Sequence, residues 1–167
     1  MASSNRFIDN DYNLEFNAEK TAGAARIVKL IKSYGVKIDG VGYQGHVTSE
    51  DTPTAPAPAP QQGVLEAALH ATADLGVDVV YTEIDVRLNT PLTAESEAVQ
   101  VATWQRMAAS CLAVKRCIGM TVWGISDKYS WIPGVFEGEG SALLWDENYE
   151  KKPSYAGFLK GITGKKN

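Results

Sequence analysis

The sequence predicts an α/β fold with a parallel sheet, because strand-like and helix-like segments alternate along the whole chain. The last three strand-like runs recur about every 40 residues, as βα units do. Four such units account for the 167 residues. A closed eight-stranded barrel needs roughly 250 residues. We therefore expect residues 1–167 to form one unit, either half of a (β/α)₈ TIM barrel with four parallel βα units or a small open α/β sheet.

Each element has its own signal in the sequence. The segment 18–34 has an apolar stripe with helical period and is followed by Gly35, where a C-cap glycine belongs. Residues 77–84 are nearly all apolar, as in a strand buried on both faces. The helix at 94–115 is expected to be interrupted or offset near its start. The expected strands are 6–9, 37–42, 77–84 and 117–124, and the expected helices are 18–34, 63–75, 94–115 and 155–162.

Composition excludes two classes of protein. The net charge of −4 argues against a nucleic-acid-binding protein, which usually carries a basic face. No run of 18 apolar residues occurs, so no membrane span is predicted. The first five residues lack the apolar core of a signal peptide. Either the protein stays inside the cell, or this chain begins downstream of its native start.

A Pro/Ala-rich stretch follows the second expected strand and is assigned to a loop at about residues 47–62. Its alternating Ala-Pro sequence is stiff and extended. A linker between two domains is one interpretation. Because βα periodicity resumes directly after it, a long loop on the face that carries the site is favoured.

Two carboxylates, Glu83 and Asp85, end the third expected strand. Their i, i+2 spacing places both on one face of a strand, and the carboxyl ends of parallel strands line the sites of barrel enzymes. A solvated strand end would explain them equally well if they stood alone. His46 follows the neighbouring strand and could contact both, which favours a site.

The aromatic residues point toward a carbohydrate. Trp123 and Trp131 flank a polar segment after the fourth expected strand. Indole faces pack against the C–H faces of pyranose rings, although either tryptophan taken singly could belong to the core. Polar side chains suited to binding sugar hydroxyl groups nearby are Tyr12, Asn13 and Gln44.

The two cysteines, Cys111 and Cys117, do not by their number reveal the redox compartment. Their spacing is not that of a zinc site. From spacing alone, they could be two small buried apolar residues or a bonded pair.

Four motifs together resemble the fungal xylanases of glycoside hydrolase family 10. They are residues 10–13 (NDYN), 39–46 (DGVGYQGH), 82–85 (TEID) and 121–131 (TVWGISDKYSW). All four occur in the order and at the spacing of that family, and the resemblance extends from about Phe7 to Leu159.

The resemblance implies a (β/α)₈ barrel that hydrolyses β-1,4-xylan with retention of configuration, without a cofactor or metal. This chain would supply strands five to eight. Glu83 falls on the nucleophile, and His46 and Asp85 on residues that hydrogen-bond around it and keep it ionised. The resemblance also implies a disulfide between Cys111 and Cys117, and hence a secreted enzyme. The substrate-binding positions fall on Tyr12, Asn13, Gln44, Trp123 and Trp131.

One departure from the family is important. The acid/base glutamate of strand four has no counterpart in this chain, and retention requires two carboxyl groups about 5–5.5 Å apart. Three hypotheses follow: half of a xylanase that acts when joined to a complementary N-terminal half, an inactive half-barrel that associates with a second copy, or a module that binds xylan or xylo-oligosaccharides without cleaving them. No nucleic-acid or membrane partner is expected.

Overall fold

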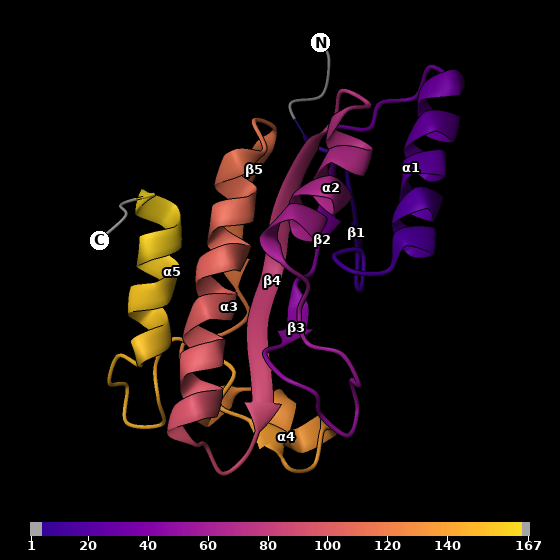
Figure 1. Ribbon diagram of the computed structural model, residues 1–167. Coiled ribbons are helices and arrows are strands. Elements are labelled where there is room, and N and C mark those ends of the chain that lie inside the picture. Colours follow the sequence, from indigo (N-terminus) through magenta and orange to yellow (C-terminus); the bar gives the residue numbers. More distant parts are fainter. Residues whose placement is uncertain (1–4, 165–167) are drawn as a thin grey trace.

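The computed structural model describes residues 5–164, which form a parallel sheet with helices packed against it (Figure 1). Strands β1 (Ile8–Asp11), β2 (Gly40–Tyr43), β4 (Asp78–Asn89) and β5 (Cys117–Val122) are parallel and lie in that order. The predicted α/β fold with a parallel sheet is therefore correct. Two short strands were not predicted: β3 (His46–Thr48), parallel to β4, and β6 (Glu139–Gly140), antiparallel to it.

The four longest helices lie side by side in Figure 1. They are α1 (Ala18–Ser33), α2 (Gln62–Ala73), α3 (Ala94–Ala113) and α5 (Pro153–Thr163), with a short 3₁₀ helix η1 (Asp127–Tyr129) and a single turn α4 (Ile132–Val135) after β5. In Figure 1, the short helix labelled α4 lies below the four long ones, near the end of β4. The expected interruption of α3 is wrong, because the helix runs unbroken from its capping box at Thr93 and Ser96. No helix among residues 5–164 is long and apolar enough to cross a membrane.

The core lies between the sheet and the helices. Tyr43, Tyr81 and Trp104 are all fully buried there. The hydroxyl groups of the two tyrosines are not left unpaired, since Tyr43 donates to the carbonyl of Ala68 at 2.7 Å and Tyr81 lies 3.1 Å from the hydroxyl of Ser110. These hydrogen bonds let the sheet bury two large polar aromatic residues against α2 and α3.

Strand β4 does not end at Glu83 and Asp85, as the sequence analysis expected, but continues to Asn89. Its second half remains a strand because it pairs with β3 on one side and β6 on the other. The pairing with β5 is irregular between Tyr81 and Ile84, which both lie buried in the core. Such a bulge shifts the alternation of side chains along the strand. After Tyr81, the next side chain to face the core is therefore that of Ile84 instead of Glu83.

Close packing of α5 on α3 depends on two glycines of α5. A Cβ atom on Gly157 would lie 2.5 Å from the carbonyl oxygen of Val101 and 2.9 Å from its Cγ1. One on Gly161 would clash with the Gln105 carbonyl and Ala108. The two helix backbones therefore approach more closely than side chains would allow.

We expect Gly157→Ala to lower the free energy of unfolding by about 1–3 kcal/mol, because the added methyl group must push the two helices apart. Gly63→Ala in α2 is the matched control, since a Cβ atom there meets nothing within 4 Å. It should be neutral or slightly stabilising, because alanine favours a helix. Urea denaturation of both variants checks this, and equal stabilities would contradict it.

Candidate active site

A left-handed glycine positions His46. Gly45 has φ 83° and separates β2 from β3. A Cβ atom there would also lie 3.2 Å from Cγ1 of Ile84, so the position suits glycine on both counts. The turn begins β3 at His46, which pairs in register with Asp85 of β4. His46 thus lies in a strand of its own, not in a loop after the preceding strand.

His46 bridges the two carboxylates that the sequence singled out. Its Nε2 lies 3.2 Å from Oε2 of Glu83, and its Nδ1 lies 2.9 Å from Oδ2 of Asp85. The other oxygen of Glu83 accepts a hydrogen bond of 2.9 Å from Nδ2 of Asn10 on β1. Trp131 donates its indole N–H to Oδ2 of Asp85 at 2.8 Å. Four segments therefore converge on one hydrogen-bonded group.

The two carboxylates differ in exposure. The Asp85 side chain is 0% exposed and both its partners meet the same oxygen, whereas Glu83 keeps 15% of its side chain exposed. Asp85 is thus placed to hold other groups, and Glu83 is placed to reach a ligand. Within residues 5–164, no group of three or more His, Cys, Asp and Glu side chains is arranged to hold a metal ion.

The charge of His46 follows from these contacts. Burial alone would lower its pKa, but the hydrogen bonds and charges of Asp85 and Glu83 outweigh this and raise the pKa above its usual 6.5. Oε2 of Glu83 can accept a hydrogen bond from Nε2 only when that nitrogen carries a proton. A protonated His46 satisfies both carboxylates at once.

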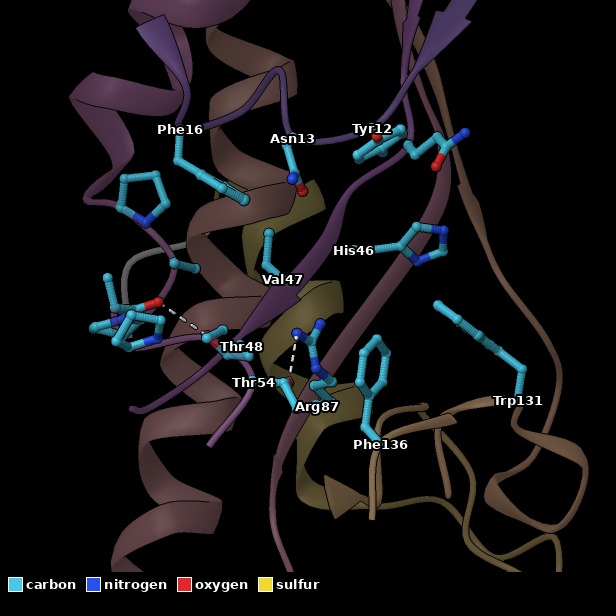
Figure 2. Close-up of a pocket in the computed structure, with 17 residues that line it drawn as sticks. Tyr12, Asn13, Phe16, His46, Val47, Thr48, Thr54, Arg87, Trp131 and Phe136 are labelled. Carbon is cyan, nitrogen blue, oxygen red and sulfur yellow. Dashed lines mark hydrogen bonds between the residues drawn. The ribbon is translucent and has the colours of Figure 1, made fainter. Parts of the chain in front are cut away.

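A pocket of about 810 Å³ opens beside His46 (Figure 2). Five of the residues proposed from the sequence line it: Tyr12, Asn13, Gln44, His46 and Trp131. Figure 2 shows Tyr12 and Trp131 on either side of the His46 ring. Neither Glu83 nor Trp123 is among the lining residues. Trp123 follows β5 and is 47% exposed, with its ring 6.4 Å from that of His46.

The Pro/Ala-rich loop forms one wall of this pocket through residues 54–60. It is shorter than the predicted 47–62, because Val47 and Thr48 belong to β3 and Gln62 begins α2. Its far end is held in place, since Arg106 of α3 donates to the carbonyls of Ala59 and Pro60 at 2.9 and 3.0 Å.

Arg87 is a pocket residue that the sequence analysis missed. It lies on β4, and its Nε donates to Glu139 at 2.7 Å. The guanidinium carbon lies 4.3 Å from the centre of the Phe136 ring, and Nη2 donates to the hydroxyl of Thr54 at 3.4 Å. Arg87 continues the i, i+2 series of Glu83 and Asp85, which was a usable signal. No pattern in the sequence marked Phe136 or Thr54 as pocket residues.

Cys111 and Cys117 form a disulfide, with Cα atoms 5.3 Å apart. It joins the last turn of α3 to the first residue of β5. The bond that the family resemblance implied is therefore present.

Comparison with known proteins gives a consistent result. Residues 2–161 match glycosyl hydrolase family 10. Endo-1,4-β-xylanase A of Fusarium oxysporum f. sp. lycopersici is 57% identical over 154 residues, which are 92% of this chain and 47% of the relative. The chain spans about half the length of the curated relatives it matches.

Solved structures agree. The xylanase of Bispora sp. MEY-1 with xylobiose superposes with a TM-score of 0.87 at 38% identity, over 93% of this chain and 46% of that one. A mutant of xylanase 10C of Cellvibrio japonicus with xylopentaose gives a TM-score of 0.86 at 29% identity, over 96% of this chain and 34% of that one. From the match over nearly its whole length and its identity with these xylanases, the chain belongs to glycosyl hydrolase family 10.

Proposed function

We propose that this chain is the C-terminal half of a retaining endo-1,4-β-xylanase and that Glu83 is its nucleophile. The observation that carries the proposal is the environment of Glu83. Asn10 and His46 hold its two oxygens at 2.9 and 3.2 Å, yet the side chain stays partly exposed near an aromatic pocket. A carboxylate that is oriented but still accessible suits attack on an anomeric carbon.

The chemistry needs a second carboxyl group. An oxygen of Glu83 bonds to the anomeric carbon of a xylose unit while the glycosidic C–O bond breaks, and an acid protonates the leaving oxygen. Water then attacks the same carbon and breaks its bond to Glu83. The residue that acted as the acid now accepts the proton of this water. Asp85 cannot be that acid, because it is fully buried and accepts hydrogen bonds from His46 and Trp131.

Asp85 instead supports the nucleophile. It holds Nδ1 of His46, which directs Nε2 at Glu83. Asp85 also accepts a hydrogen bond from the indole N–H of Trp131. This bond fixes the orientation of the ring, whose face can then pack against a sugar in the pocket. Tyr12, Asn13 and Gln44 supply polar groups along the same pocket, and Trp123 extends the aromatic surface outside it. We assign xylan or xylo-oligosaccharides as the ligand, since relatives are bound to xylobiose and xylopentaose.

An incomplete barrel is consistent with the open sheet. Among the strands described in residues 5–164, β1 pairs only with β2, and β5 only with β4. Apolar side chains of both edge strands are exposed, Ile8 on β1 and Ile118 on β5. Such edges favour further pairing. The proposal is that four more strands close a (β/α)₈ barrel, from a complementary N-terminal half or from a second copy. The disulfide supports an extracellular enzyme.

Complementation tests the function directly. The N-terminal part of the Fusarium relative, which this chain does not cover, would be expressed separately and mixed with the chain. We expect hydrolysis of xylo-oligosaccharides with β products appearing first by NMR, and none from either part alone. Sedimentation of the chain alone should show self-association. Xylanase activity from the chain without a partner, or a strictly monomeric chain, would contradict the proposal.

Sugar binding without turnover is the second candidate. It is favoured by the pocket, because all the residues that line it belong to this chain. Tryptophan fluorescence during titration with xylopentaose tests it. Saturable quenching by the isolated chain would support binding, and complementation would then decide whether the bound sugar is cleaved.

A further inference from the structure

Glu15 is a buried carboxyl group that the mechanism above does not use. It lies between β1 and α1 and is fully buried. Its Oε1 accepts a 2.7 Å hydrogen bond from the backbone N–H of Gly45. Its Oε2 has no hydrogen-bond partner among residues 5–164. Burying a carboxyl group with only one oxygen hydrogen-bonded costs free energy of folding. A role for this group would explain why the protein has it there.

The group that Glu15 holds is the turn that carries His46. The carbonyl of Gly45 accepts a hydrogen bond of 3.3 Å from the N–H of Asp85, and the carbonyl of Gln44 accepts one of 2.8 Å from the N–H of Glu83. Strand β4 therefore holds the turn on one side. Glu15 provides a further contact, at the left-handed residue directly before His46.

We propose that Glu15 is a positioning residue for His46: its carboxyl group fixes the Gly45 turn that sets the imidazole between Glu83 and Asp85, and its charge is linked to that of His46. For its catalytic consequence, this inference rests on the proposed role of Glu83. The geometry of the turn stands without that role.

The electrostatics support the linkage. Burial raises the pKa of Glu15 to about 7, against the opposing effects of its own backbone N–H, of the Gly45 N–H and of the nearby charges of His46 and Lys20. The pKa of His46 is also raised, because the hydrogen bonds and charges of Asp85 and Glu83 outweigh its burial. Because coupling between two sites is reciprocal, an ionised Glu15 must favour protonated His46 as much as His46 favours ionised Glu15.

The other titratable and charged groups near Glu15 lie on several neighbouring elements. Lys20 on α1 is paired with Asp11 at 2.9 Å. Tyr43 on β2 and Tyr81 on β4 both have raised pKa values, chiefly from burial, to which the charge of Glu15 adds. Neither tyrosine ionises near neutral pH. From α2, the residues that line the small pocket beside Glu15 are apolar: Val64, Ala67, Ala68 and Ala71. Of the charges that lower the pKa of Glu15, that of His46 belongs to the candidate site.

The chain has two histidines, so ¹⁵N NMR can follow both imidazoles. His70 on α2 serves as an internal reference, since it pairs with the exposed Asp74. Glu15→Gln keeps the shape and an acceptor for the Gly45 N–H but removes the charge. We expect it to lower the pKa of His46 by about 0.5 unit and to leave His70 unchanged. Glu95→Gln, an exposed charge on α3, is the control and should change neither.

Glu15→Leu removes the acceptor as well. Hydrogen exchange of the Gly45 amide should accelerate by about tenfold or more in this variant and stay slow in Glu15→Gln. An unchanged pKa of His46 in Glu15→Gln would overturn the charge linkage. Unchanged Gly45 exchange in Glu15→Leu would overturn the positioning role, and if that variant does not fold, Glu15→Gln still decides the linkage. Neither measurement uses xylan, so failure here is distinct from failure of Glu83 as the nucleophile.

Discussion

Glu83→Gln should lower the turnover of the complemented barrel by about 10⁴-fold or more, because a neutral amide lacks the negative charge of the oxygen that attacks the anomeric carbon. Sugar binding should remain. Glutamine has nearly the same volume, and its carbonyl can accept the hydrogen bond that Asn10 donates to Glu83. Its amide N–H can donate to a neutral His46, so the bridge to Asp85 can persist. Hydrolysis rates and xylopentaose titration of the same preparation separate the two effects.

Glu147→Gln is the matched control, since Glu147 is exposed on the loop before α5. It should leave turnover unchanged. A 2-fluoro xylobioside with a good leaving group should trap the covalent intermediate in the complemented barrel. Peptide mass spectrometry should find the label on Glu83 and on no other residue of this chain. Label on Asp85, or turnover retained by Glu83→Gln, would show that the roles are wrong.

Asp85→Asn should lower the free energy of unfolding by about 3 kcal/mol, because it removes the buried charge that accepts from both His46 and Trp131. An asparagine oxygen can serve one of these donors well but carries no charge to match His46. Asp74→Asn is the control. It alters a pair of the same chemistry, His70 and Asp74 at 3.0 Å, that is exposed on α2. An exposed pair contributes little, so its loss should cost less than about 0.5 kcal/mol.

The cost of Asp85→Asn should depend on pH in a defined direction. The pKa of His46 is raised in the folded protein, so protonated His46 stabilises the fold. That contribution is complete below the unfolded pKa of 6.5 and is lost as pH rises through the folded pKa. Urea denaturation should therefore show a larger difference from the wild type at about pH 5.5 than at about pH 9. A difference independent of pH, or an equal loss in Asp74→Asn, would contradict this account.

The sequence was sufficient for the fold class and the main elements. Helical periodicity and capping residues are local, so α1 and α3 begin where their patterns begin, at Ala18 and Ala94. The alternation of strands and helices predicted that the strands run parallel. The residues of the candidate site were also found from the sequence, since Glu83, Asp85 and His46 stand out as polar side chains beside apolar strands.

Tertiary structure decided what local patterns do not contain. The extent of β4 beyond Asp85 depends on β3 and β6, which are too short to have a signal of their own. The partners of Glu83 and Asp85 come from segments far apart in sequence, such as Asn10 and Trp131. Glu15 became visible only when its hydrogen bond to Gly45 was placed. Periodicity reports which face of an element is buried, whereas hydrogen bonds and pKa values arise from distances between elements, which only the folded chain sets.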